Sequence, residues 1–490
     1  MPYFPQTFRQ FVLKNPFNRQ YLLIAAIAIV VQLIIFKILY PYADFFSDSY
    51  SYIYAAILKQ EVNLWPIGYT IFLRLFHVFS HSDTALVAVQ YILIQCSALY
   101  LFFSVSYWLQ PGEQTRRVIF YVLLFNPLIL YISNYVSSDG LFLAISLVWF
   151  TQLLWLLHRP SYVLLIAHGL LIAIAFTVRY NAMYYPLITA LVLLRCPQKI
   201  AFKALGIVLP LVLIGVFINF TKEATRKVTG TAQFSVFGGW QMANNALYMF
   251  PYLKDYPEPP AGCEAFHKEV VHFFRDIIPK GGGIPSPMQG AIYLKHPQAP
   301  LKKFLQLSYG NKDDTTGGIH SWGMVSPVYE KYGSYMIRQH PFYFARYFLL
   351  PNTFNYFVPP LEKLSEYNLG SYSVSPVARY WFHYHSKQLS SVASIGAQKA
   401  LLFFFPILFG LLNLIFLGLI FKWFVSTTRK TAARPYRDSQ LLVLITLVVN
   451  AGFGILASPI VFRYQVFPMI VCFIFISILA DKLKPELQST

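Results

Sequence analysis

The sequence predicts an all-α membrane protein that crosses the bilayer repeatedly, with about ten transmembrane helices and one mostly helical extracytoplasmic domain. Of its 490 residues, 56% are hydrophobic and only 12% are charged, and the mean hydropathy is +0.50. Soluble domains carry about 25% charged residues. The apolar residues also collect in runs of a length that can cross a bilayer. Together these observations exclude a soluble enzyme and a disordered chain.

An N-terminal transmembrane module is predicted over residues 1–220. Its first span, Tyr21–Tyr40, is long enough to stay in the membrane rather than be removed as a signal peptide. An outer loop over residues 41–82 follows. Six further runs are expected to cross the membrane: Thr84–Trp108, Val118–Ile132, Leu141–Leu157, Tyr162–Val178, Met183–Leu194 and Ala204–Phe220. A re-entrant or partly buried segment is the alternative for the run that begins at Met183.

Basic residues between the runs give the orientation. The clusters that fall on one side of the predicted spans are Arg9 to Arg19, Arg116 and Arg117, Arg159, and Arg195 to Lys203. Lys and Arg accumulate in cytoplasmic loops. We therefore expect both termini in the cytoplasm and the exit of the first span on the outer face.

Residues 221–399 are rich in Pro, Gly and Tyr and contain no clean span, so they are predicted to fold as the extracytoplasmic domain. Two stretches in it are amphipathic, Phe266–Ile278 and Tyr335–Phe348, and the second is suited to lie along the membrane surface. The C-terminal module, residues 400–490, is expected to contribute three spans. These are Ala400–Val425, Leu441–Ala457 and Val466–Ala480.

The net charge of +19 alone would suit a nucleic-acid partner. The basic residues follow the membrane topology instead. We therefore expect membrane lipids, and no nucleic acid, as partners. The four cysteines, Cys96, Cys196, Cys263 and Cys472, are scattered, so neither a disulfide framework nor a metal-binding pair is predicted.

Two carboxylates stand at the exit of the first span, Asp44 and Asp48. A carboxylate at a low-dielectric boundary can take a proton from a hydroxyl, which is the task of a general base. The alternative is that Asp48 or Ser47 caps a short helix beginning at Ser49, and the two roles are compatible.

A third acid, Asp139, precedes the fourth span on the same face. An Asp before an apolar helix is commonly an N-cap, which is the simpler interpretation. The convergence of three acids at one predicted membrane depth favours a shared cavity.

Two arginines, Arg179 and Arg463, lie at the outer ends of spans. A guanidinium offers planar, bidentate donors to a phosphate and stays charged at any working pH. The alternative for each is an anchor whose charged head reaches the membrane interface.

These residues resemble the motifs of the GT-C superfamily of integral-membrane glycosyltransferases, which includes protein O-mannosyltransferases and bacterial aminoarabinose transferases. The stretches that carry the resemblance are Asp48-Ser49-Tyr50-Ser51-Tyr52, Trp65-Pro66-Ile67-Gly68-Tyr69, Ser138-Asp139-Gly140, Val178-Arg179-Tyr180-Asn181, Ile337-Arg338-Gln339-His340-Pro341 and Phe462-Arg463-Tyr464. It covers about residues 1–220 and 335–480. Residues 221–334 match no motif of the family.

The resemblance implies a GT-C-like fold and an enzyme of the bacterial cytoplasmic membrane. Such an enzyme transfers a sugar from a polyprenyl-phosphate donor to a lipid, glycan or protein acceptor on the outer face, with inversion. Asp48 is then the expected base with Asp44 as its rival, Asp139 orients a substrate, and Arg179 and Arg463 hold the donor phosphate. Their neighbours Tyr52, Tyr180, Asn181 and Tyr464 are expected to line the substrate site.

Three matters stay open at this level. No metal ligands are assigned and no cofactor is required, with a divalent metal ion as an alternative. A transporter or flippase for a lipid-linked saccharide would also have many spans, but transporters usually carry ionisable residues near the bilayer midplane and repeated halves. A ligase that transfers a whole glycan would use the same acids.

Overall fold

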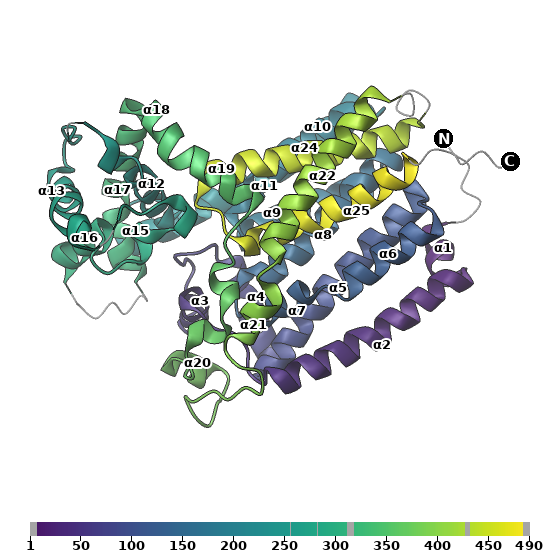
Figure 1. The fold of residues 1–490 in the computed structure, drawn as a ribbon, viewed down its shortest axis with the longest axis horizontal. Helices are drawn as coiled ribbons and strands as arrows, with labels where there is room; N and C mark the ends of the chain where they lie inside the picture. Colours follow the sequence, from purple (N-terminus) through teal and green to yellow (C-terminus); the bar gives the residue numbers. More distant parts are fainter. Residues whose placement is uncertain (1–6, 255, 282, 311–317, 427–431, 484–490) are drawn as a thin grey trace.

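In a computed structural model, the described residues form helices and short turns but no strands (Figure 1). Residues 1–6, 255, 282, 311–317, 427–431 and 484–490 lie outside the described part of the chain. The prediction of an all-α protein is confirmed.

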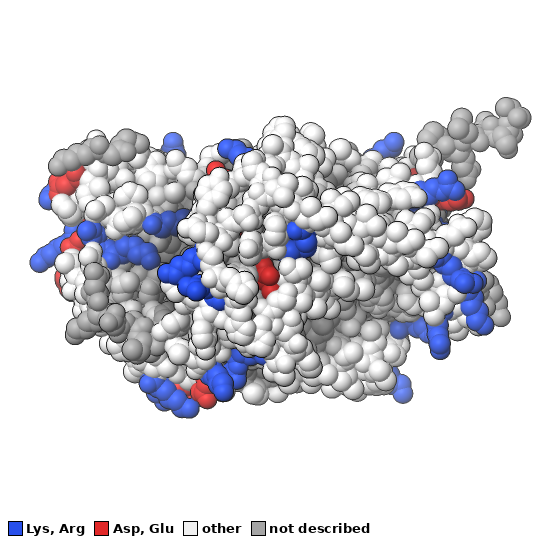
Figure 2. All heavy atoms as spheres, turned by 90° about the horizontal axis from the view of Figure 1, so that it is seen from below, with Lys and Arg blue, Asp and Glu red and all other residues white. Residues whose placement is uncertain are grey.

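Within the described residues, eight helical segments are long and apolar enough to cross a membrane. They are Pro16–Leu39 (α2), Asp83–Leu109 (α5), Glu113–Asn134 (α6, Glu113–Leu124, with α7, Pro127–Asn134), Ser138–His158 (α8), Ile200–Thr229 (α11), Ala397–Val425 (α21, Ala397–Leu402, with α22, Phe405–Val425), Arg434–Ala457 (α24) and Phe462–Lys482 (η8, Phe462–Gln465, with α25, Val466–Lys482). On the face shown in Figure 2, a broad band over these helices carries almost no charged side chain, whereas Lys and Arg gather toward both ends.

Local sequence sets where these helices begin and end. Asn15 caps α2, with Pro16 in the first turn, where its missing N–H costs no hydrogen bond. Ser82 caps α5 through the N–H of Ala85. The 30-residue α11 stops at Gly230, whose φ of 74° places it in the left-handed region that glycine adopts easily.

Three apolar segments differ from the expected set of ten spans. Tyr162–Val178 (α9) forms where predicted, but its 17 residues are fewer than those of the eight long segments. The run from Met183 becomes a 3₁₀ turn (η1, Tyr180–Tyr184) followed by an 11-residue helix, Tyr185–Arg195 (α10). Such a helix is too short to cross a bilayer alone, which needs about 20 residues. The apolar helix Gly68–Phe79 (α4) in the first outer loop was not predicted.

The predicted 221–399 domain is arranged in two parts, and α11 extends into it as far as Thr229. Residues 236–349, here called the helical body, form their own hydrophobic core around Trp240, Phe266 and Tyr329. In Figure 1 this body lies at one end of the molecule and α1 (Phe8–Lys14) at the other. Its elements are α12 (Val236–Leu247), η2 (Phe250–Tyr252), α13 (Glu264–His272), η3 (Phe273–Ile277), α14 (Ile278–Gly281), η4 (Pro287–Gln289), α15 (Ile292–Lys295), α16 (Pro300–Tyr309), α17 (Ile319–Gln339), α18 (Pro341–Phe344) and η5 (Ala345–Leu349).

Residues 350–396, here called the returning segment, pack back onto the bundle and the first outer loop. Val374 and Trp381 share a buried cluster with Ala43 and Tyr52, about 330 residues earlier in the chain. The elements of this segment are α19 (Leu350–Phe357), η6 (Glu362–Ser365), η7 (Tyr367–Gly370) and α20 (Pro376–Trp381). Of these, α20 packs against α3 (Ser47–Ile57) of the first loop. The returning segment thereby brings residues distant in sequence to the end of the bundle.

Candidate active site

A cavity of about 250 Å³ is lined by residues of the helix bundle together with residues of α12 in the helical body. Its walls come from α3, α8, η1, α12, α24 and η8. Eight of the nine residues singled out in the sequence line it: Asp48, Tyr52, Asp139, Arg179, Tyr180, Asn181, Arg463 and Tyr464. The chain thus gathers at one place the polar residues that end several different helices.

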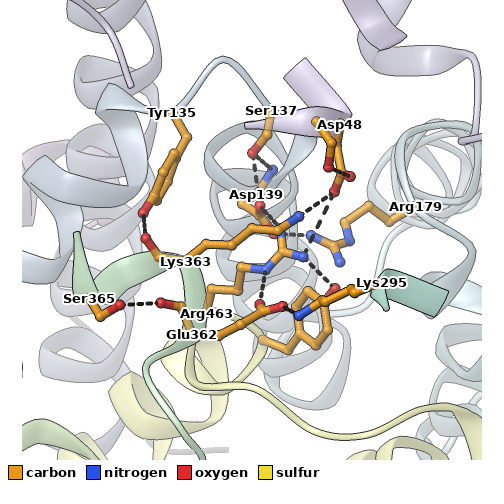
Figure 3. Close-up of polar contacts among 12 residues, drawn as sticks. Asp48, Tyr135, Ser137, Asp139, Arg179, Lys295, Glu362, Lys363, Ser365 and Arg463 are labelled. Atoms are coloured by element: carbon orange, nitrogen blue, oxygen red, sulfur yellow. Dashed lines mark hydrogen bonds and ion pairs between the residues drawn. The ribbon is translucent and has the colours of Figure 1, made fainter. Parts of the chain in front are cut away.

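Asp139 lies at the centre of the charged wall (Figure 3). One of its carboxylate oxygens accepts from Arg179 Nη1, and the other lies 2.9 Å from Arg463 Nη1. The side chain of Asp139 is only 3% exposed, and those of Arg179 and Arg463 are 14% and 7% exposed. Both arginines therefore point into the protein rather than reaching for the membrane interface.

The local backbone conformation orients the side chains of Asp139, Arg179 and Arg463. The N-cap of α8 is Ser137, whose hydroxyl oxygen accepts from the Asp139 N–H, so Asp139 occupies the first turn and is not itself the cap. The same hydroxyl donates to Asp139 Oδ2 at 2.8 Å. Arg179 is the residue that ends α9, and Arg463 lies in the turn η8 before α25. Each charged side chain thus projects from a helix end, where the backbone changes direction.

Asp48 lies on the same wall, in the first turn of α3, with a side chain that is 17% exposed. Its Oδ2 accepts from Lys363 Nζ at 3.0 Å and lies 3.8 Å from Arg463 Nη2, while its Oδ1 accepts from the Ser47 hydroxyl. Neither Asp48 nor Ser47 makes a capping hydrogen bond at α3, which begins after Phe46. Asp48 is thus a cavity-lining carboxylate, more accessible than Asp139.

Aromatic rings fill the space between the charges. The guanidinium carbons of Arg179 and Arg463 lie 4.6 and 4.7 Å from the centre of the Tyr464 ring, and Arg463 Nη2 donates to its hydroxyl at 2.8 Å. The Tyr52 hydroxyl donates to Ser138 Oγ at 3.1 Å, and the Tyr180 hydroxyl to the carbonyl of Phe234 at 3.3 Å. These contacts fix the wall because cation–π attraction and hydrogen bonds act on the same side chains.

Three residues of the site were missed in the sequence: Lys295, Glu362 and Lys363. Glu362 Oε2 lies 3.6 Å from Arg463 Nε, and its other oxygen accepts from Lys295 of the helical body. The cluster thus has four cations and three carboxylates. The only sequence signal for it is that Glu362 and Lys363 follow a run without any charged residue, from Tyr347 to Leu361.

Burial and neighbouring charges act in opposite directions on the pKa values of Glu362 and Lys363. Burial alone would raise the pKa of Glu362, but the charges of Arg463, Lys295 and Lys363 hold it below its ordinary value. Burial and the neighbouring Arg463 lower the pKa of Lys363, while Asp48 and Glu362 act against this shift. A cluster with one surplus positive charge is suited to receive an anionic group.

Asp44 is the one predicted residue that the structure places outside the cavity. It is 2% exposed, and its Oδ1 accepts from the backbone N–H of Asn368 at 2.9 Å. Its own backbone pairs with Asn134 and Val136. Burial raises its pKa well above the ordinary value, and the hydrogen bonds from Asn368 and Phe45 offset only part of this shift. Asp44 is a buried acid that fastens the first loop to the returning segment.

Among the described residues, no group of three or more His, Cys, Asp or Glu side chains is arranged to hold a metal ion. The acids of the cavity are instead separated by arginine and lysine. Three histidines come close to one another as rings rather than as a ligand set: His77 and His81 meet edge to face with centroids 4.0 Å apart, and His81 and His383 stack with centroids 4.5 Å apart.

No protein-family model matches the chain, and neither the curated proteins nor the solved structures give a match. The functional argument therefore rests on the residues and geometry of the cavity.

Proposed function

We propose that the protein is a membrane glycosyltransferase that moves a sugar from a polyprenyl-phosphate donor to a hydroxyl group of a lipid, glycan or protein at the outer membrane face. One observation carries the proposal. A partly accessible carboxylate, Asp48, shares a cavity at the end of a helix bundle with two almost buried arginines, Arg179 and Arg463.

The arrangement supplies what such a transfer needs. Asp48 takes the proton of the acceptor hydroxyl as its oxygen bonds to the anomeric carbon, and the bond from that carbon to the phosphate oxygen breaks. The polyprenyl phosphate leaves with the bonding pair, and Arg179 and Arg463 stabilise its added charge. Because Asp139 is occupied by both arginines, it orients them and is not free to attack the sugar. A single displacement follows, and we expect inversion.

A second group of cavity-lining residues, from α24, supports a lipid-linked donor. Asn450, Phe453, Gly454 and Ala457 recur at the spacing of one face of α24, and all four line the cavity. Three of the four are apolar, and α24 is a candidate membrane span. A donor can therefore keep its phosphate at the charged wall and its prenyl chain beside α24, within the hydrocarbon region of the bilayer.

Mass spectrometry of cell-envelope glycans and lipids, with and without the gene, would name the donor and the acceptor. The purified protein in liposomes is then supplied with that donor and acceptor, and glycosidic product is measured. We expect product from the wild type. Movement of a lipid-linked saccharide across the liposome membrane without bond formation would contradict the proposal and favour a transporter.

A further inference from the structure

Lys363 is the cation closest to Asp48. Its Nζ donates to Asp48 Oδ2 at 3.0 Å, and its side chain is only 12% exposed. The same nitrogen lies 3.8 Å from the centre of the Phe46 ring, the residue from which α3 begins. The ammonium is thus held against the start of the helix that carries Asp48, by a charge on one side and a ring on the other.

The backbone around Lys363 is fixed from three directions. The Tyr135 hydroxyl donates to its carbonyl at 2.7 Å, Gln398 Nε2 donates to the carbonyl of Leu364 at 3.0 Å, and the Phe462 N–H donates to the carbonyl of Pro360 at 2.9 Å. Glu362 has a φ of 53°, in the left-handed region that a residue with a side chain seldom adopts. This turn sends Glu362 to Arg463 and Lys363 to Asp48 (Figure 3).

The other cations near Asp48 and the Tyr52 hydroxyl make their shorter contacts with other residues. Arg463 approaches the same oxygen at 3.8 Å but is divided among three carboxylates, those of Asp48, Asp139 and Glu362. Arg179 pairs with Asp139. Tyr52, one turn further along α3, donates its hydroxyl to Ser138. Lys363 alone among these groups gives its hydrogen bond to Asp48.

We propose that Lys363 is a positioning residue for Asp48, whose ammonium keeps that carboxylate ionised and turned toward the cavity before an acceptor arrives. The role rests on the proposed function of Asp48 as the base. A cation within hydrogen-bond distance of a carboxyl group favours its ionised form. Lys363 touches neither substrate in this scheme and acts only through Asp48.

Carbodiimide labelling tests the proposal without an activity assay, because a hydrophobic carbodiimide adds only to a protonated carboxyl group. The purified full-length protein is labelled with dicyclohexylcarbodiimide at a series of pH values, and modification of Asp48 is followed by peptide mass spectrometry. In Lys363→Met, the pH at which half of Asp48 is labelled should rise by about one unit or more relative to the wild type. Lys363→Gln repeats the test with a polar neutral side chain if the first variant folds poorly.

Two further variants make the result specific. Lys363→Arg restores a cation and should return the midpoint toward that of the wild type. Lys295→Met removes a cation that pairs with Glu362 rather than Asp48, and should leave the midpoint where it was. An unchanged midpoint in both neutral variants of Lys363 would overturn the proposal, as would an equal shift in Lys295→Met.

The pH profile of turnover separates this proposal from the proposed function. Where glycosidic product forms, the acid limb of the rate profile in Lys363→Met should move in the same direction as the labelling midpoint, and Lys363→Arg should move it back. A moved labelling midpoint with no product from any variant, the wild type included, would contradict the transferase and leave the action of Lys363 on Asp48 standing. Glycosidic product together with an unmoved labelling midpoint would support the transferase and contradict the action of Lys363 on Asp48.

Discussion

Two neighbouring stretches of the first outer loop lie in opposite environments. The backbone of Asp44 pairs with Asn134 and Val136, and its side chain is buried against Asn368. A few residues later the chain turns into α3, and Asp48 lines the charged cavity. In the sequence both acids are candidates for a base, with Asp48 expected and Asp44 as its rival. The difference teaches that the backbone direction at each position, and not the residue type, decides which acid faces the cavity.

The largest expected effect separates these two acids directly. Asp48→Asn removes the proposed proton acceptor, and general bases typically contribute about 10²–10⁴-fold to the rate. Turnover in the reconstituted assay should fall by that factor. Asp44→Asn keeps an acceptor oxygen for Asn368 and should leave turnover within about twofold of the wild type.

Both variants should elute as monodisperse proteins with nearly wild-type thermal stability, which shows that the loss is chemical. Near-normal turnover in Asp48→Asn would remove that residue as the base. A large loss in Asp44→Asn would make the buried acid, rather than the cavity acid, the essential one.

The next largest effect is expected for Arg463, the cation shared by Asp48, Asp139 and Glu362. Arg463→Met leaves Asp139 and Glu362 with fewer counter-charges in a nearly buried position, and removing one partner of a buried ion pair typically costs about 3–5 kcal/mol. Thermal denaturation in detergent should show a marked drop in stability. Arg434→Met is the matched control, because Arg434 is 61% exposed and pairs with Asp438 at the surface, where such pairs contribute about 0–1 kcal/mol. Equal effects in the two variants would show that the cluster is not electrostatically coupled.

The structural role of Asp44 is tested by its alanine variant. Asp44→Ala leaves the buried N–H of Asn368 without its acceptor, which should cost about 1–3 kcal/mol of unfolding free energy. The asparagine variant supplies that acceptor and should lose far less. The comparison is made by chemical denaturation of both variants at one pH. If alanine and asparagine behave alike, the hydrogen bond to Asn368 contributes little.

The smallest expected effect is a dependence of folding stability on pH that comes from Asp44. A carboxyl group in the unfolded chain titrates near pH 4, whereas burial raises the pKa of Asp44 in the folded protein. The folded state therefore binds the proton more tightly, so its contribution to stability is complete below about pH 4 and is lost as the pH rises through the raised pKa. The stability of Asp44→Asn relative to the wild type should grow with pH, by at most about 1.4 kcal/mol per unit. Parallel stability curves for the two proteins would contradict this.

Much of the bundle and part of the site follow from local sequence. Apolar runs of about 20 residues predict long helices with little ambiguity. Such runs end at or next to Asp139, Arg179 and Arg463. The sequence alone therefore predicts that these three side chains lie at a common depth. The shorter run after Met183 was less determined, because length alone does not tell a span from a helix buried against its neighbours.

The rest depends on contacts that no local pattern contains. Glu362 and Lys363 reach Arg463 and Asp48 because distant residues anchor the backbone around them. These anchors are Tyr135, more than 220 residues earlier in the chain, and Gln398, about 35 residues later. The burial of Asp44 depends in the same way on Asn368. Neither the placement of Glu362 and Lys363 nor the burial of Asp44 could be inferred from residues 41–82 alone. The polarity of a side chain predicts that it lies near water, but it does not predict which distant segment covers it.

The contact between Tyr464 and both arginines has a practical consequence. Its ring lies within 5 Å of two guanidinium carbons and on the wall of the cavity, so any anion that draws Arg179 or Arg463 toward itself also changes the electric field at that ring. Indole emission is sensitive to such fields. A tryptophan introduced at position 464 would therefore act as an optical gauge of occupancy, with which candidate lipids could be screened by fluorescence titration before any acceptor is known.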